Sequence, residues 1–164
     1  MSFGEDDGGS EVELETLHGR NWPTITQFSV FLENRVGQLM EVVRPFQGTK
    51  VKIIGLTISD SADCSIIRLI LSHPEQGREV LALSKHAFAE NELVAVELSA
   101  SPNALGELCM ALLQAEINIH YAYPLIVHPR GRPAVAMHID NTEQASRTLH
   151  EMGFEVLSEA DLAS

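Results

Sequence analysis

The 164-residue chain contains no apolar run of the roughly 18–20 residues that a membrane-spanning helix requires. Positive charge is also scarce, because 11 basic residues stand against 23 acidic ones and leave a net charge of −12. A surface with this excess of negative charge repels nucleic-acid phosphates and anionic lipids, which argues against nucleic acid or a membrane as a partner. The N-terminus is acidic and glycine-rich, whereas a secretory signal is basic and then apolar. We therefore expect a cytoplasmic protein.

Cysteines and aromatic residues are few. The two cysteines, Cys64 and Cys109, lie far apart within apolar patterns, which favours buried thiols in a reducing compartment over a disulfide. Aromatic residues make up 5% of the chain and hydrophobic residues 45%, so aliphatic side chains must form most of the core.

Sequence signatures of catalysis and of metal binding are also missing. The chain has no Gly-x-Ser-x-Gly elbow and no phosphate-binding loop, and its seven histidines show no His-x-x-x-His spacing. We therefore expect no enzyme activity, no catalytic residue, no cofactor and no metal site. One alternative stays open, because His120 and His138 would meet if their strands pair in a hairpin.

The periodicity of apolar residues divides the chain into a tail and two similar halves. Residues 1–22 hold six acidic residues and no apolar period, which predicts a flexible acidic tail. Alternation and helical spacing then predict a strand at 28–32, a helix at 39–46, hairpin strands at 50–59 and 64–72, a helix at 73–86 and a strand at 88–98.

The same order of segments then repeats. The predicted segments are a strand at 93–98, a helix at 105–112, hairpin strands at 117–127 and 134–139, a helix capped by Asn141 and ended by Gly153, and a strand at 154–157. Leu39 and Ile53 correspond to Leu105 and Ile119. The pattern predicts an α+β fold of two tandem ferredoxin-like βαββαβ modules, residues 23–92 and 93–164, with antiparallel sheets and the helices on one face. Arg130 and Arg132, at the tip of the second hairpin, are expected to be solvated. Tyr121 and Tyr123 share one strand face and are expected to pack in a core or an interface.

Two short motifs resemble the ACT family. The segment Glu33–Leu39 is similar to the ligand loop of ACT domains, Glu-Asn-x-Pro-Gly-x-Leu, with Val36 in the place of the proline. The segment Ile117–Ile119 is similar to the Gly-Ile-Asn-Ile stretch that opens the second strand in that family. The resemblance extends over residues 24–160 and implies a tandem ACT protein, a family of regulatory domains that bind amino acids.

The chemistry of the loop agrees with that resemblance. Gly37 supplies the positive φ of a tight strand-to-helix turn, and the helix start that follows attracts a carboxylate. The resemblance implies that the loop asparagine of one module and the strand asparagine of its neighbour converge on one ligand. The predicted mixed site comprises Asn34, Arg35, Val36, Gly37, Gln38, Leu39, Asn118 and Ile119. A weaker reciprocal site comprises Lys52, Ile53, Ser101, Asn103 and Ala104, because Lys52 and Ala100 replace the two asparagines there.

Three functions follow from this interpretation. The first is a regulator of amino-acid metabolism, expected to be a homodimer, that holds an amino acid or a similar small metabolite at the interface between ACT modules. The second is a regulatory small subunit of acetolactate synthase or a similar biosynthetic enzyme, because Phe28–Leu39 also resembles the start of that subunit. The third is a dimerisation module without a ligand. In that case Gly37 only permits the tight turn, and the Asn118 side chain only forms a hydrogen bond with a neighbouring backbone group.

Overall fold

The computed structural model describes residues 22–164, so the predicted acidic tail lies outside the described residues except for Trp22. The first half contains β1 (Ile25–Leu32), α1 (Gln38–Val43), the 3-10 turn η1 (Arg44–Phe46), β2 (Ile53–Asp60), β3 (Ser65–Leu71), α2 (Pro74–Leu83) and β4 (Ala87–Glu97). The second half contains α3 (Ala104–Gln114), β5 (Ile119–Pro124), the 3-10 turn η2 (Pro129–Gly131), β6 (Ala134–Ile139), α4 (Thr142–Glu151), β7 (Val156–Leu157) and α5 (Glu159–Leu162). These elements confirm the predicted α+β fold.

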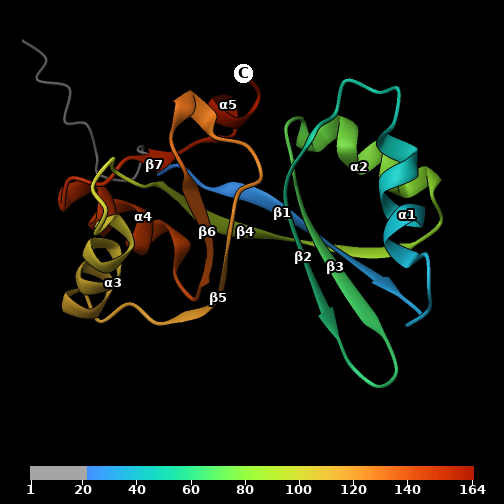
Figure 1. The fold of residues 1–164 in the computed structure, drawn as a ribbon, viewed down its shortest axis with the longest axis horizontal. Helices are drawn as coiled ribbons and strands as arrows, with labels where there is room; N and C mark the ends of the chain where they lie inside the picture. The colour runs from blue at the N-terminus through green and yellow to red at the C-terminus, as the bar shows by residue number, and fades with distance from the viewer. Residues whose placement is uncertain (1–21) are drawn as a thin grey trace, which may run out of the picture.

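One strand serves both modules. The sheet has the order β2-β3-β1-β4-β6-β5, and β7 also pairs with β4. From Ala87 to Leu93 the strand β4 pairs with β1, whereas from Val94 to Glu97 it pairs with β6, and all pairs are antiparallel. The strand that ends the first βαββαβ unit is therefore continuous with the strand that begins the second (Figure 1).

The helices cover the sheet as two separate pairs. Figure 1 shows α1 and α2 at one end of the molecule and α3 and α4 at the other, with β1 and β4 crossing between them. Val42 and Leu81 bury α1 and α2 against Phe28 and other residues of the first half. Leu108 and Leu149 belong to a second core of the other half. Local signals set the helix boundaries as predicted, because Pro74 begins α2 and Asn141 caps α4.

The sheet curls until its two outer strands touch. Gly55 of β2 forms an isolated antiparallel bridge with Leu125, and the Ile126 amide donates to the carbonyl of Ile54 at 2.6 Å. We call this contact, formed by Ile54, Gly55, Leu125 and Ile126, the seam. A Cβ at Gly55 would lie 3.2 Å from Leu125 Cδ2 and 3.0 Å from Ile70 Cδ1, so a glycine permits this close approach.

A third core fills the inside of the curl. It draws on both halves of the chain and includes Ile25, Ile70, Leu93, Leu125 and Leu162. The modules are thus joined by a shared strand, by a shared core and by the seam.

The two cysteines differ in their surroundings. Cys64 and Cys109 are both free, but Cys109 is exposed on α3 and Cys64 is half-buried, so the prediction of two buried thiols is wrong. Within residues 22–164, no helix has the length and hydropathy needed to cross a membrane.

Candidate functional site

The loop between β1 and α1 has the turn geometry that its glycine predicts. Gly37 has φ +90° and precedes α1, and its carbonyl accepts from the Glu41 amide at 3.2 Å. An ion pair of 2.6 Å between Arg35 and Glu41 fastens the loop to the helix. The Asn34 side chain donates to Asp60 Oδ2 at 3.2 Å, so this amide is turned toward the end of β2.

The structure does not bring the two asparagines of the predicted mixed site together within one chain. Asn118 is exposed in the connection from α3 to β5, and Ile119 packs toward the second core. Figure 1 shows that connection well apart from the connection between β1 and α1, toward opposite ends of the molecule's long axis. Val36 is exposed, while Gln38 and Leu39 are half-buried at the start of α1. A shared ligand would therefore need a second copy of the chain.

The residues of the predicted reciprocal site are also divided. Ser101 donates to Glu107 at 3.1 Å and accepts from the Asn103 amide at 3.1 Å, which builds the turn before α3. Asn103 and Ala104 line two cavities along that helix. Ile53 packs on the first core, whereas Lys52 lines a cavity at the junction of the two modules.

This junction holds a small cavity of about 120 Å³, which we call the seam cavity. Its wall from the first module includes Lys52, Ile54 and Ser72, and its wall from the second includes His128, Asp161 and Leu162. The cavity lies beside the seam, because Ile54 belongs to both. In the predicted reciprocal site Lys52 has different neighbours, namely Ser101, Asn103 and Ala104.

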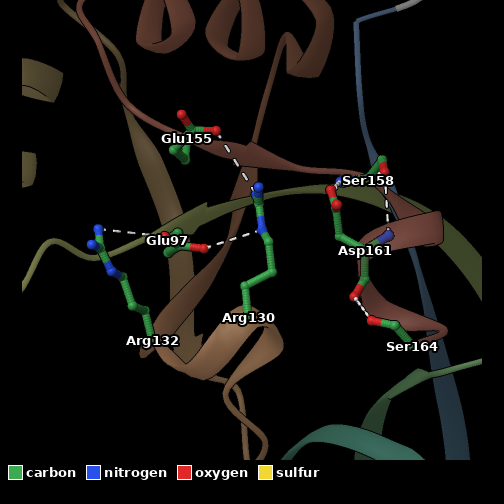
Figure 2. Close-up of polar contacts among 7 residues, drawn as sticks. All are labelled: Glu97, Arg130, Arg132, Glu155, Ser158, Asp161 and Ser164. Carbon is green, nitrogen blue, oxygen red and sulfur yellow. Dashed lines mark hydrogen bonds and ion pairs between the residues drawn. The ribbon is translucent and has the colours of Figure 1, made fainter.

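Ion pairs hold the second-module wall of the cavity. Arg130 also lines the cavity, and its guanidinium lies 3.4 Å from the almost buried carboxylate of Glu97 and 3.8 Å from Glu155 (Figure 2). Arg132 pairs with Glu97 at 3.7 Å. Both arginine side chains are exposed, as expected, and each also pairs with the almost buried Glu97. Arg130 has φ +56°, a left-handed backbone conformation that residues other than glycine rarely adopt.

Asp161 is fixed by the start of α5. Its Oδ2 accepts from the Ser158 amide at 2.8 Å and from the Ser158 hydroxyl at 3.0 Å, while the Asp161 amide donates back to Ser158 Oγ at 3.4 Å (Figure 2). The backbone hydrogen bond from Ser158 is the main cause that lowers the pKa of Asp161. The carboxylate therefore stays ionised and presents its other oxygen, Oδ1, outside the capping bonds.

A buried polar network ties the modules together inside the curl. Gln27 Nε2 donates to Asn91 Oδ1 at 2.9 Å and to the Tyr121 hydroxyl at 2.8 Å, and Gln27 Oε1 accepts from the Tyr123 hydroxyl at 2.7 Å. The Arg68 guanidinium lies 4.4 Å from the centre of the Tyr121 ring. Burial raises the pKa of Tyr123, which keeps its hydroxyl a donor. The expectation that the two tyrosines pack in a core or an interface is confirmed, because Tyr123 belongs to the third core and Tyr121 packs against it.

Two histidines meet on β5 and β6. The rings of His120 and His138 lie 5.2 Å apart, and His138 also stacks on Tyr121 at 4.8 Å. Asp140 pairs with His120. Burial is the main cause that lowers the pKa of His138, and the neighbouring His120 adds to it. Across residues 22–164 no group of three or more histidine, cysteine or acidic side chains is placed to hold a metal ion.

Comparison with known proteins gives this arrangement a family. A model of the ACT domain pair matches residues 23–164. The chain is similar to the crystal structure of protein BT0572 from Bacteroides thetaiotaomicron, with 26% identity, coverage of 86% of this chain and 96% of that one, and a TM-score of 0.76. It shares its fold with the ligand-free regulatory subunit of aspartate kinase from Thermus thermophilus, with 13% identity, coverage of 78% and 91%, and a TM-score of 0.54. A comparison with curated proteins finds no significant match. The chain belongs to the ACT domain pair family.

Proposed function

We propose that this chain is a non-catalytic regulatory protein that binds a free amino acid where ACT modules meet. The observation that carries the proposal is the junction of the modules, where a shared strand, a seam and a cavity of about 120 Å³ with cationic, anionic and apolar lining lie together. A zwitterion needs both signs of charge close to each other. A ligand held there touches both modules and stabilises one arrangement of them over others.

The predicted mixed site is a second part of the same proposal. It takes Asn34 and Gly37 from one copy of the chain and Asn118 from another, which agrees with the expected homodimer. One neighbour of similar fold is the regulatory subunit of aspartate kinase from Thermus thermophilus, and that role supports a regulatory function here. A biosynthetic enzyme is accordingly the partner class that we expect.

A thermal-shift panel of the twenty amino acids tests the function. A ligand that binds the folded chain raises Tm, and a concentration of about 100 times Kd stabilises it by about 2.7 kcal/mol. We expect one amino acid or a small chemical group of them to raise Tm in proportion to the logarithm of concentration. If none of the twenty shifts Tm, the protein is a scaffold and the proposal fails.

A further inference from the structure

We propose that the seam cavity is itself an amino-acid site, in which Lys52 binds the α-carboxylate and Asp161 binds the α-ammonium group of a small amino acid. This inference rests on the proposed function, because it takes the amino acid as ligand class. It assigns the site to residues of a single chain, separate from Asn34 and Asn118.

The charges around the cavity decide which group binds which end of the ligand. Arg130 is engaged by Glu97 and Glu155. Lys52 forms no ion pair with any residue between 22 and 164, and it is one of the residues that line the cavity. Lys52 is therefore the cation that is available for a carboxylate.

The opposite charge comes from α5. Asp161 uses Oδ2 for the capping box with Ser158, and within the described part of the chain Oδ1 accepts no hydrogen bond. The lowered pKa keeps this carboxylate ionised at neutral pH. A carboxylate whose orientation is fixed by a helix cap is well suited to an ammonium group, because the protein need not reorganise to bind it.

Size and apolar lining limit the ligand further. Pockets for drug-sized ligands measure roughly 300–1,000 Å³, whereas this cavity measures about 120 Å³. The buried side chains of Ile54 and Leu162 form its apolar wall. The cavity therefore suits an amino acid with a short side chain and excludes tryptophan or arginine.

Occupation of the cavity would connect the modules. Lys52 immediately precedes β2 of the first module and Ile54 lies at its start, while Asp161 and Leu162 belong to α5 of the second. The hydrogen bond from the Ile126 amide to the carbonyl of Ile54 lies directly beside them. A bound amino acid adds a bridge between α5 and β2 and thereby favours the closed seam.

Isothermal titration calorimetry of the full chain with glycine, alanine, serine and valine tests the site. We expect Lys52→Met, which keeps the apolar stem and removes the charge, to weaken binding by about tenfold or more. The matched control is Lys50→Met, an exposed lysine two residues earlier that lines none of these cavities, and it should bind as the wild type does. The methyl ester and the N-acetyl derivative of the best ligand should both fail to bind, because each removes one charged end.

The outcomes separate this inference from the proposed function. If Lys52→Met binds like the wild type while Asn34→Ala with Asn118→Ala abolishes binding, the ligand occupies the predicted mixed site, and this inference is wrong while the function stands. If the wild type binds none of these amino acids but another of the twenty shifts Tm, the inference is again wrong. If no amino acid binds at all, both proposals fail. A folded Lys52→Met protein is verified by its unchanged thermal midpoint without ligand.

Discussion

Gln27 is a buried polar residue whose hydrogen bonds connect β1 with Asn91 of β4 and with Tyr121 and Tyr123 of β5 in the other module. Replacing it with leucine keeps the volume but leaves the Tyr123 hydroxyl and the Asn91 amide without this partner. We expect Gln27→Leu to lower the free energy of unfolding by about 1–3 kcal/mol. A double-mutant cycle measured by urea denaturation tests the pair. Tyr123→Phe should lower the free energy of unfolding less in the Gln27→Leu protein than in the wild type, with a coupling energy of about 0.5–3 kcal/mol. Strictly additive losses would show that the two side chains do not interact.

His138 makes stability depend on pH in a direction that its surroundings set. Burial lowers its pKa below the usual 6.5, His120 and Arg68 lower it further, and Asp140 opposes them. The unfolded chain therefore takes up this proton more readily than the folded one, so stability from His138 is complete above about pH 6.5 and is lost as the pH falls toward the folded pKa. The His138→Gln protein should show a smaller loss of unfolding free energy between about pH 7 and pH 5, measured by urea denaturation. Parallel curves for the two proteins would contradict this assignment.

Single residues were predictable from the sequence where their role is local. The positive φ of Gly37 and the capping by Asn141 depend on neighbours a few positions away. The environment of Arg130 was not predictable in this way, because Glu97 approaches from a strand more than thirty positions earlier in the chain. Likewise, the pattern around Lys52 gives no sign that Asp161 faces the same cavity.

At the scale of the element, the N-cap of α4 gives a direct test of local helix stability. The Asn141 side chain accepts from the Gln144 amide at 3.0 Å. We expect Asn141→Ala to lower the free energy of unfolding by about 1 kcal/mol, whereas Asn141→Asp, which keeps the acceptor, should remain close to the wild type. Chemical denaturation of the three proteins measures this. Equal stability of the alanine and wild-type proteins would mean that the cap does not stabilise α4.

The helices and hairpins were predictable from the sequence because their apolar residues recur with helical spacing over several turns, or alternate along several strand positions. Two elements differ from the prediction for identifiable reasons. The predicted strands at 88–98 and 93–98 are one strand, β4, since its partners change at Leu93 without any break in the backbone. The four-residue helix α5 is too short to show a helical period. Its Ser158-x-x-Asp161 capping box was the readable signal for it.

At the scale of the whole molecule, the shared strand predicts that the modules fold together. The expected boundary between residues 92 and 93 divides β4, so a fragment of 22–92 loses part of its longest strand and one of 93–164 loses its support from β1. We expect the intact chain to unfold in one transition by both circular dichroism and tyrosine fluorescence, and neither fragment to unfold cooperatively alone. Two separate transitions in the intact chain would show that the modules are independent.

The duplication was visible in the sequence, but the way the modules meet was not. Two ferredoxin-like units can pair by their edges, by their faces or through a common strand, and similar apolar patterns serve each arrangement. The curl depends on contacts between distant residues, such as the approach of Leu125 to Gly55. The seam cavity results from that curl. The sequence therefore indicates a ligand site between the modules, but it does not indicate which residues line that site.

Hydrogen exchange with and without a saturating amino acid tests most directly whether a ligand acts where the modules join. We expect slower exchange in both modules, at the Ile126 amide beside the seam and the Asp161 amide of α5 in the second module, and at the amides of β2 in the first. Exchange that is unchanged with all twenty amino acids, or slowed in one module alone, would contradict it.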